Sequence, residues 1–270
     1  LDAAIDWLET EPSGASTPWP DVNDRTNGLL DGSLITVGAR PGHGKSLVAK
    51  DVGLYVARQG LPVHIATLEM SRNEYLARIL SGLGRIDLGR MLRRQMSDHD
   101  WSTVAALMEK VRGLPLYLDD RPGQSMAQIR AAARQTQRRY GDLRLLAIDY
   151  AQLISARDHR MERRLQVDEI SRSAKLMAKE FSCPVMLLAQ LNRGNTQRAD
   201  HRPLLSDLRE SGALEQDSDQ VWLLHRPDQY GDETRLGEVD LIVGKNRNGP
   251  APVTIPLAFQ GHYASVVSMV

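Results

Sequence analysis

The sequence predicts an α/β fold with a mostly parallel sheet flanked by helices and antiparallel strands added at the C-terminal edge. Two observations support this expectation. In the first two thirds of the 270 residues, short apolar runs alternate with helix-period segments, which is typical of a parallel sheet covered on both faces. The last third has four apolar runs without helices between them, at residues 221–224, 238–243, 253–257 and 263–267. We expect these runs to form the antiparallel addition.

The remaining elements follow from apolar runs and helix-start signals. Parallel strands are expected at residues 34–37, 62–68, 114–118, 143–148 and 185–188. Capping boxes at residues 71–74 and 125–128 predict helix starts, the first helix reaching about residue 83. Residues 97–100 predict another start, and a long helix is expected from about 165 to 181. The helix after Ser125 is basic, and we expect its arginines, including Arg130, Arg134 and Arg138, on a solvated face.

One eight-residue loop carries the clearest functional signal. It lies between the first parallel strand and a helix-period stretch that begins at Leu47, and it reads Ala39, Arg40, Pro41, Gly42, His43, Gly44, Lys45, Ser46. The two glycines let backbone N–H groups converge on an anion at the positive end of the helix dipole. Lys45 is expected to reach the β- and γ-phosphates, and Ser46 to hold Mg²⁺. Although Ala39 stands where the general pattern has glycine, the loop predicts binding of a nucleoside triphosphate with Mg²⁺.

Three polar residues at strand ends extend this site. Asp149 ends the strand 143–148 and is expected to bind the hydrated Mg²⁺, although an aspartate at a strand end is common. Glu69 follows the strand 63–68, which we expect beside the phosphate-loop strand, and a carboxylate there can activate the attacking water. The alternative for Glu69 is capping of the next helix. Gln190 ends the strand after 185 and is a candidate contact to the γ-phosphate.

Composition narrows the classes of protein. The chain has 34 basic and 34 acidic residues and a formal net charge of zero, which argues against nucleic-acid binding through a wholly basic surface. No apolar run approaches transmembrane length, so no membrane association is expected. The single cysteine, Cys183, suits a reducing compartment such as the cytoplasm. Because the chain begins with Leu1 rather than Met, we expect a fragment of a longer protein.

Six segments occur in an order that carries a family resemblance. They are A-R-P-G-H-G-K-S at 39–46, T-L-E-M at 67–70, I-D-Y-A-Q-L at 148–153, A-Q-L-N-R at 189–193, S-D-L-R-E-S-G at 206–212 and G-K-N-R-N-G at 244–249. The phosphate loop alone is unspecific, whereas the last two segments are specific. Together they resemble the motor domain of DnaB-type replicative DNA helicases over residues 19–270.

The resemblance implies a RecA-like P-loop ATPase and roles for further residues. Members of that family form rings of six around one DNA strand, with ATP at each subunit interface. Lys245 and Arg247 match the pair that reaches the neighbouring subunit's γ-phosphate, with an exposed basic turn as the alternative. Arg78 matches an arginine near the phosphates, unless it makes a surface salt bridge. Arg209, Glu210 and Gly212 match the DNA-binding loop of the channel, unless they form an ordinary polar loop.

The resemblance also implies partners and a domain boundary. A homo-hexamer on single-stranded DNA is expected, with primase and a helicase loader as further partners. Residues 1–9 are amphipathic and resemble a linker helix, followed by a flexible tether, so residues 1–18 are set apart from a motor domain at 19–270. The expected function is ATP-driven translocation on single-stranded DNA and unwinding of duplex during replication. The alternative is a RecA-like ATPase switch that assembles or remodels a protein or DNA complex without unwinding.

Overall fold

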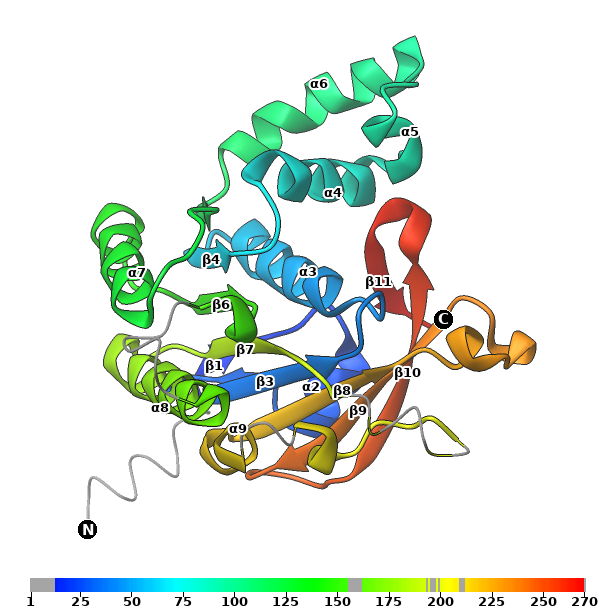
Figure 1. The fold of residues 1–270 in the computed structure, drawn as a ribbon. Helices are drawn as coiled ribbons and strands as arrows, with labels where there is room; N and C mark the ends of the chain where they lie inside the picture. The colour runs from blue at the N-terminus through cyan, green and yellow to red at the C-terminus, as the bar shows by residue number, and fades with distance from the viewer. Residues whose placement is uncertain are drawn as a thin grey trace.

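A nine-stranded mixed sheet forms the centre of the molecule (Figure 1). The computed structural model of the chain describes residues 13–154, 162–192, 194, 198, 200–208 and 212–269. Within these residues the strands of the large sheet are β3 (Leu34–Ala39), β4 (Val63–Thr67), β5 (Leu116–Asp119), β6 (Leu145–Asp149), β7 (Val185–Gln190), β8 (Gln220–His225), β9 (Glu238–Asn246), β10 (Val253–Gln260) and β11 (Ser265–Ser268). They lie in the order β11-β10-β9-β8-β3-β7-β6-β4-β5.

The direction of each strand confirms the predicted fold class, with two corrections. From β5 to β8 all pairs are parallel, and β9, β10 and β11 continue the sheet as antiparallel strands. The run 221–224 was expected to belong to the antiparallel addition. This expectation was wrong for the pairing with β3, because β8, which contains the run, is parallel to β3 and antiparallel only to β9. The expectation that β4 adjoins the phosphate-loop strand was also wrong. β7 and β6 lie between β3 and β4, and strand order depends on tertiary packing rather than on chain order.

Helices cover both faces of the sheet. The helices of the described residues are α2 (Pro20–Thr26), α3 (Lys45–Arg58), α4 (Arg72–Gly84), α5 (Leu88–Leu92), α6 (Asp98–Arg112), α7 (Met126–Tyr140), α8 (Arg163–Phe181) and α9 (Gly212–Asp217). Of these, α5 and α6 pack on α4 rather than on the sheet (Figure 1). Alternate strand residues divide between two apolar cores: Met186 and Leu188 of β7 pack on the α3 side, whereas Val185 and Leu187 pack on the α7 and α8 side. Because both faces of the sheet are covered, residues that point to either face are apolar, and each strand appears in the sequence as a continuous apolar run.

Capping explains where several helices begin. Ser71 with Glu74 and Ser125 with Gln128 form the predicted capping boxes, and Ser97 with Asp100 forms a third at the helix start expected there. The basic face of α7 is half-exposed, as expected for a solvated face. It also forms ion pairs, because Arg130 and Arg134 both contact Glu180 at the end of α8.

The segment before α2 is packed on the domain. Gly14–Ala15 form β1, which pairs with β2 (Leu29–Leu30). Trp19 is fully buried, and its Nε1 donates a hydrogen bond to Val266 O at 3.1 Å. The described part of the expected tether therefore forms ordered structure from Ser13 onward, because an indole binds it to the C-terminal strand. The expected linker helix at residues 1–9 lies outside the described residues.

Candidate functional site: a phosphate loop at the carboxyl edge of the sheet

The loop between β3 and α3 has the backbone that a phosphate site requires. Gly42 and Gly44 have φ angles of 79° and 92°, in the left-handed region that favours glycine. A Cβ atom on Gly44 would also lie 2.9 Å from the Phe259 ring, so glycine is needed for space as well. Because α3 begins at Lys45, the loop N–H groups lie at the positive end of the helix dipole.

Lys45 contacts two carboxylates, one in β6 and one just after the end of β4. Its Nζ lies 3.1 Å from Asp149 Oδ1 and 3.2 Å from Glu69 Oε2. The same ammonium lies 4.2 Å from the centre of the Tyr150 ring, a cation–π contact. Register explains the convergence, because Thr67 of β4 pairs with Asp149 of β6 at the carboxyl edge of the sheet. The structure thus brings Lys45, Glu69 and Asp149 together as the sequence predicts.

Asp149 has the properties of a cation ligand. Burial raises the pKa of its carboxyl group, and Lys45 and the Ser46 hydroxyl partly oppose that rise. Its Oδ2 atom is buried and has no hydrogen-bond partner among the described residues. A hydroxyl and a carboxylate at this position fit a hydrated Mg²⁺ that takes its other ligands from water and phosphate oxygens. No cluster of three or more acidic, histidine or cysteine side chains able to hold a metal occurs in the described chain.

A cavity of about 390 Å³ opens beside the loop. Its walls include the loop residues Arg40, Pro41, Gly42, Gly44, Lys45, Ser46 and Leu47, together with Glu69, Arg78 and Gln190. Gln190 pairs with Ala39 in the register of β7 and β3, which places it next to the loop. The Arg78 guanidinium donates to Glu74 O at 3.0 Å within its own helix. Both residues therefore reach the predicted nucleotide site.

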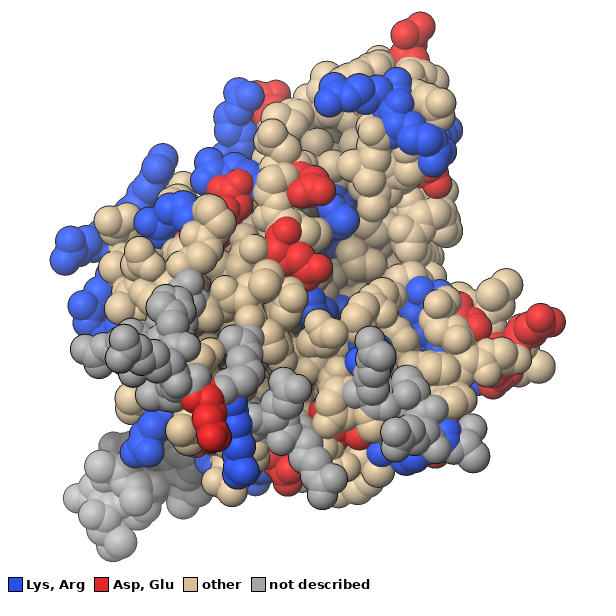
Figure 2. All heavy atoms as spheres, viewed as in Figure 1, with Lys and Arg blue, Asp and Glu red and all other residues tan. Residues whose placement is uncertain are grey.

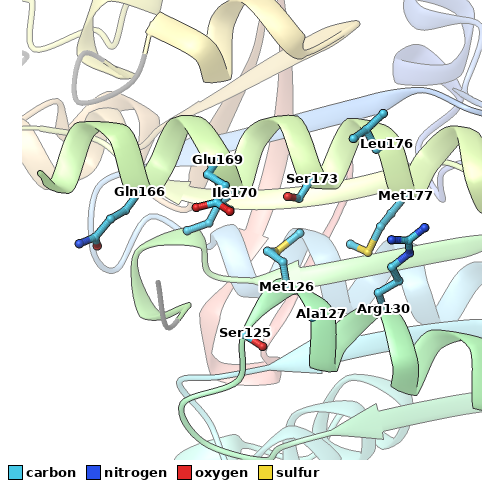
Figure 3. Close-up of a pocket in the computed structure, with 10 residues that line it drawn as sticks. All are labelled: Ser125, Met126, Ala127, Arg130, Gln166, Glu169, Ile170, Ser173, Leu176 and Met177. Atoms are coloured by element: carbon cyan, nitrogen blue, oxygen red, sulfur yellow. The ribbon is translucent and has the colours of Figure 1, made fainter. Parts of the chain in front are cut away.

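A second cavity, about 330 Å³ in volume, lies between α7 and α8 (Figure 3). Its lining is mainly apolar, with Met126, Ile170 and Met177 pointing toward one another and Arg130 at one end (Figure 3). None of its lining residues comes from the phosphate loop or the strand ends around Lys45. The cavity at the loop is therefore the candidate nucleotide site.

His43 occupies the loop as a neutral side chain. Burial, followed by the nearby His225, lowers its pKa to about 4, although a backbone hydrogen bond at Leu224 opposes the shift. Its ring lies edge-on to Tyr230, with 5.7 Å between ring centres. At neutral pH the histidine therefore fills space beneath the loop and adds no charge to a bound phosphate.

Lys245 and Arg247 lie far from the phosphate loop of their own subunit. Lys245 pairs with Val221 in β8, and Val221 pairs with Thr36 in the first half of β3. The Arg247 N–H donates to Asp219 O, next to the first residue of β3, whereas the loop follows the last residue. Lys245 Nζ donates to Glu215 O at 2.5 Å, and burial lowers its pKa. This pair therefore lies near the amino end of β3, opposite the end that leads into the phosphate loop.

The predicted DNA-binding residues are only partly described. Arg209 and Glu210 lie outside the described residues. Gly212 is the first residue of α9 and is exposed.

Several residues around the nucleotide cavity were missed by sequence reasoning. Tyr150 contacts Lys45 through its ring, and Leu88, Phe259, Gly261 and Ala264 line the cavity. Tyr150 follows the predicted Asp149, and that adjacency was an available signal. The other four come from α5 and the β10–β11 hairpin, and no local pattern in the sequence connects them to a loop at residues 39–46.

Comparison with known proteins places the chain in a family. A profile described as "DnaB-like helicase C terminal domain" matches residues 14–268. The chain belongs to this family.

Curated relatives agree with the DnaB assignment. The chain is 44% identical over 277 residues to "Replicative DNA helicase DnaB" of Leifsonia xyli subsp. xyli (strain CTCB07), covering 100% of this chain and 60% of that protein. It is 48% identical over 206 residues to the protein of the same name from Mycobacterium intracellulare, covering 76% of this chain and 35% of that protein. The chain thus spans about a third to three fifths of the length of these two relatives.

Solved structures show that the DnaB-like domain has a RecA-like ATPase fold. One is described as "The Structure Of A DnaB-Like Replicative Helicase And Its Interactions With Primase", with a TM-score of 0.93 and 31% identity over 100% of this chain and 68% of that one. Another, described as an "ATPase Domain", has a TM-score of 0.91 and 32% identity over 99% of this chain and 95% of that one. The predicted family and fold are both confirmed.

Proposed function

We propose that this domain is the ATP-hydrolysing motor of a hexameric replicative DNA helicase that moves along single-stranded DNA and unwinds duplex. The observation that carries the proposal is the convergence of Lys45, Glu69 and Asp149 at the phosphate loop of a DnaB-like domain. The family relation extends the proposal from nucleotide hydrolysis to work on DNA.

The catalytic roles follow from charge and position. Lys45 and the loop N–H groups bind the β- and γ-phosphates, and Arg78 and Gln190 border the same cavity. Glu69, whose side chain is 50% exposed, is placed to accept the proton of the attacking water. Ser46 and Asp149 would hold Mg²⁺, which supplies charge neutralisation on the phosphate oxygens when bound.

Hydrolysis is completed by a second subunit. Lys245 and Arg247 lie at the end of the strands opposite the loop, which supports a role at a neighbouring site rather than at their own. A guanidinium supplied from the neighbour stabilises the developing charge on the transferred phosphate. ATP would therefore bind between subunits, which favours a closed ring.

The DNA strand is assigned to the loop around Arg209, Glu210 and Gly212. Basic and acidic residues are interspersed on the face shown in Figure 2, in keeping with the zero net charge. Affinity for DNA would then come from one small set of contacts repeated around the ring, chiefly to phosphates. Primase and a helicase loader are proposed as partners of the longer protein.

A forked DNA substrate tests the proposal directly. Strand displacement that requires ATP, together with ATP turnover stimulated by single-stranded DNA, is the expected result. Turnover without displacement or stimulation by DNA would instead support a switch that remodels a partner. Sedimentation with an ATP analogue and a single strand measures ring assembly, and a monomer under those conditions would contradict the hexamer.

A further inference from the structure

Asp219 lies in the link between α9 and β8, where three parts of the fold meet. Its backbone N–H donates to Leu34 O at 2.9 Å, and its carbonyl accepts the Arg247 N–H at 2.9 Å. Its side chain is 13% exposed. The backbone of this single residue thus joins the start of the phosphate-loop strand to the turn that carries Arg247.

The side-chain carboxylate of Asp219 also joins the start of β3 to Arg247. Oδ2 accepts from the Leu34 N–H at 2.7 Å and lies 2.6 Å from Lys175 Nζ. Lys175 of α8 also donates to Gly32 O at 3.0 Å. The other oxygen, Oδ1, lies 3.1 Å from Arg247 Nη1. Two contacts therefore hold one oxygen, while the second oxygen faces the arginine.

Arg247 is oriented but remains accessible. Its Nη2 donates to Gln216 O at 2.6 Å, so the carboxylate and a carbonyl together define the plane of the guanidinium. The side chain is 47% exposed. Since a guanidinium carries more N–H donors than these two contacts use, donors remain for a phosphate outside the subunit.

We propose that Asp219 is a positioning residue that holds Arg247 in the orientation needed at the neighbouring subunit's nucleotide site. The inference rests on the proposed function, in which Arg247 acts in trans. Because Leu34 begins β3 and the phosphate loop follows its end, Asp219 anchors the arginine of each subunit to the strand that carries that subunit's own loop. Pre-set orientation lowers the barrier because no reorganisation is needed in the transition state.

Steady-state ATP turnover by assembled rings tests the role of Asp219. Asp219→Asn should lower kcat by about 10²-fold, the scale of loss from a misplaced catalytic group, without changing the KM for ATP. Adding Asp219→Asn to Arg247→Ala should cause no further loss, because the positioned group is already gone. Asp31→Asn is the matched control: Asp31 pairs with Arg144 at 3.2 Å, away from Arg247, and its loss should leave turnover unchanged.

The outcomes separate this inference from the proposed function. Full turnover by Arg247→Ala alone would refute the action of Arg247 in trans. With Arg247 essential, normal or increased turnover by Asp219→Asn would refute positioning, and so would an equal loss in the Arg247→Ala background, which indicates a structural role. If thermal unfolding shows that Asp219→Asn does not fold, Asp219→Glu moves the carboxylate but keeps its charge. Wild-type kcat in that folded variant would also overturn the inference.

Discussion

At the scale of single residues, Lys45 carries the positive charge around which the other groups of the candidate nucleotide site are arranged. Its ammonium contacts two carboxylates and an aromatic ring, and the side chain is only 12% exposed. Incoming phosphates would compete with these carboxylates for the ammonium, and the Asp149 carboxylate, whose pKa burial raises, would then need another cation to stay charged. Binding of ATP and of Mg²⁺ are therefore expected to reinforce each other.

Two variants separate binding from chemistry at this site. Lys45→Ala should abolish hydrolysis because the β- and γ-phosphates lose their neutralising ammonium. Glu69→Gln should still bind ATP but not hydrolyse it, because the amide keeps the shape and cannot accept a proton. Turnover and binding of a fluorescent ATP analogue measure the two effects. Activity of Lys45→Ala above about a tenth of wild type would contradict the phosphate-loop assignment, and loss of binding in Glu69→Gln would make Glu69 structural.

At the scale of elements, His64 joins β4 to α7. It is fully buried, and its Nδ1 lies 2.8 Å from Thr136 Oγ1. Burial lowers its pKa from 6.5 to about 4, although Asp119 opposes that shift. Between these two values the unfolded chain binds more protons than the folded chain. The contribution of His64 to stability is therefore fully present above pH 6.5 and is lost as the pH falls toward 4.

His64→Asn should flatten the acid side of the stability curve. The amide can replace the hydrogen bond to Thr136 without taking up a proton in the unfolded chain. Chemical denaturation between pH 4 and pH 7 measures the free energy of unfolding of variant and wild type. His99→Asn, an exposed position on α6, is the control and should keep the wild-type slope. An unchanged slope in His64→Asn would show that other groups determine acid unfolding.

At the scale of the whole molecule, the proposed function requires contacts between copies of the chain. The loop and the Lys245–Arg247 pair lie at opposite ends of the sheet strands, so under the proposed function a single subunit would not complete its own site. Each interface in a ring would combine one loop with one arginine.

Mixed rings test whether the loop and the arginine of one site come from different subunits. Arg247→Ala should lower turnover by about 10³-fold or more while the subunit stays folded. Mixing it with Lys45→Ala subunits should restore part of the activity, because some interfaces then combine an intact loop with an intact arginine. The measurement is ATP turnover across mixing ratios. Absence of rescue, in rings shown to contain both variants, would argue against action in trans.

DNA binding should also depend on the ring. With zero net charge, affinity requires contacts summed over subunits, so binding should need ATP and prefer single strands of any sequence. Arg209→Ala should weaken binding equally for all sequences and flatten its salt dependence, since fewer counterions are released. Fluorescence anisotropy at several salt concentrations measures both. Wild-type affinity in this variant would move the site elsewhere, with Arg138 of α7 a candidate because Arg130 and Arg134 already pair with Glu180.

Local signals in the sequence determined the element types, the phosphate loop, the helix caps and the family of this protein. Gly42 and Gly44 act through their own backbone angles, and the capping serines act through hydrogen bonds to residues three positions away. Spacing in the sequence therefore predicts both. The tertiary structure alone decided the strand order, the parallel pairing of β8 and the approach of Phe259 to Gly44. It also decided the position of Asp219 between Leu34, Lys175 and Arg247. These contacts join residues far apart in the chain, and they depend on how complete elements pack rather than on any local pattern.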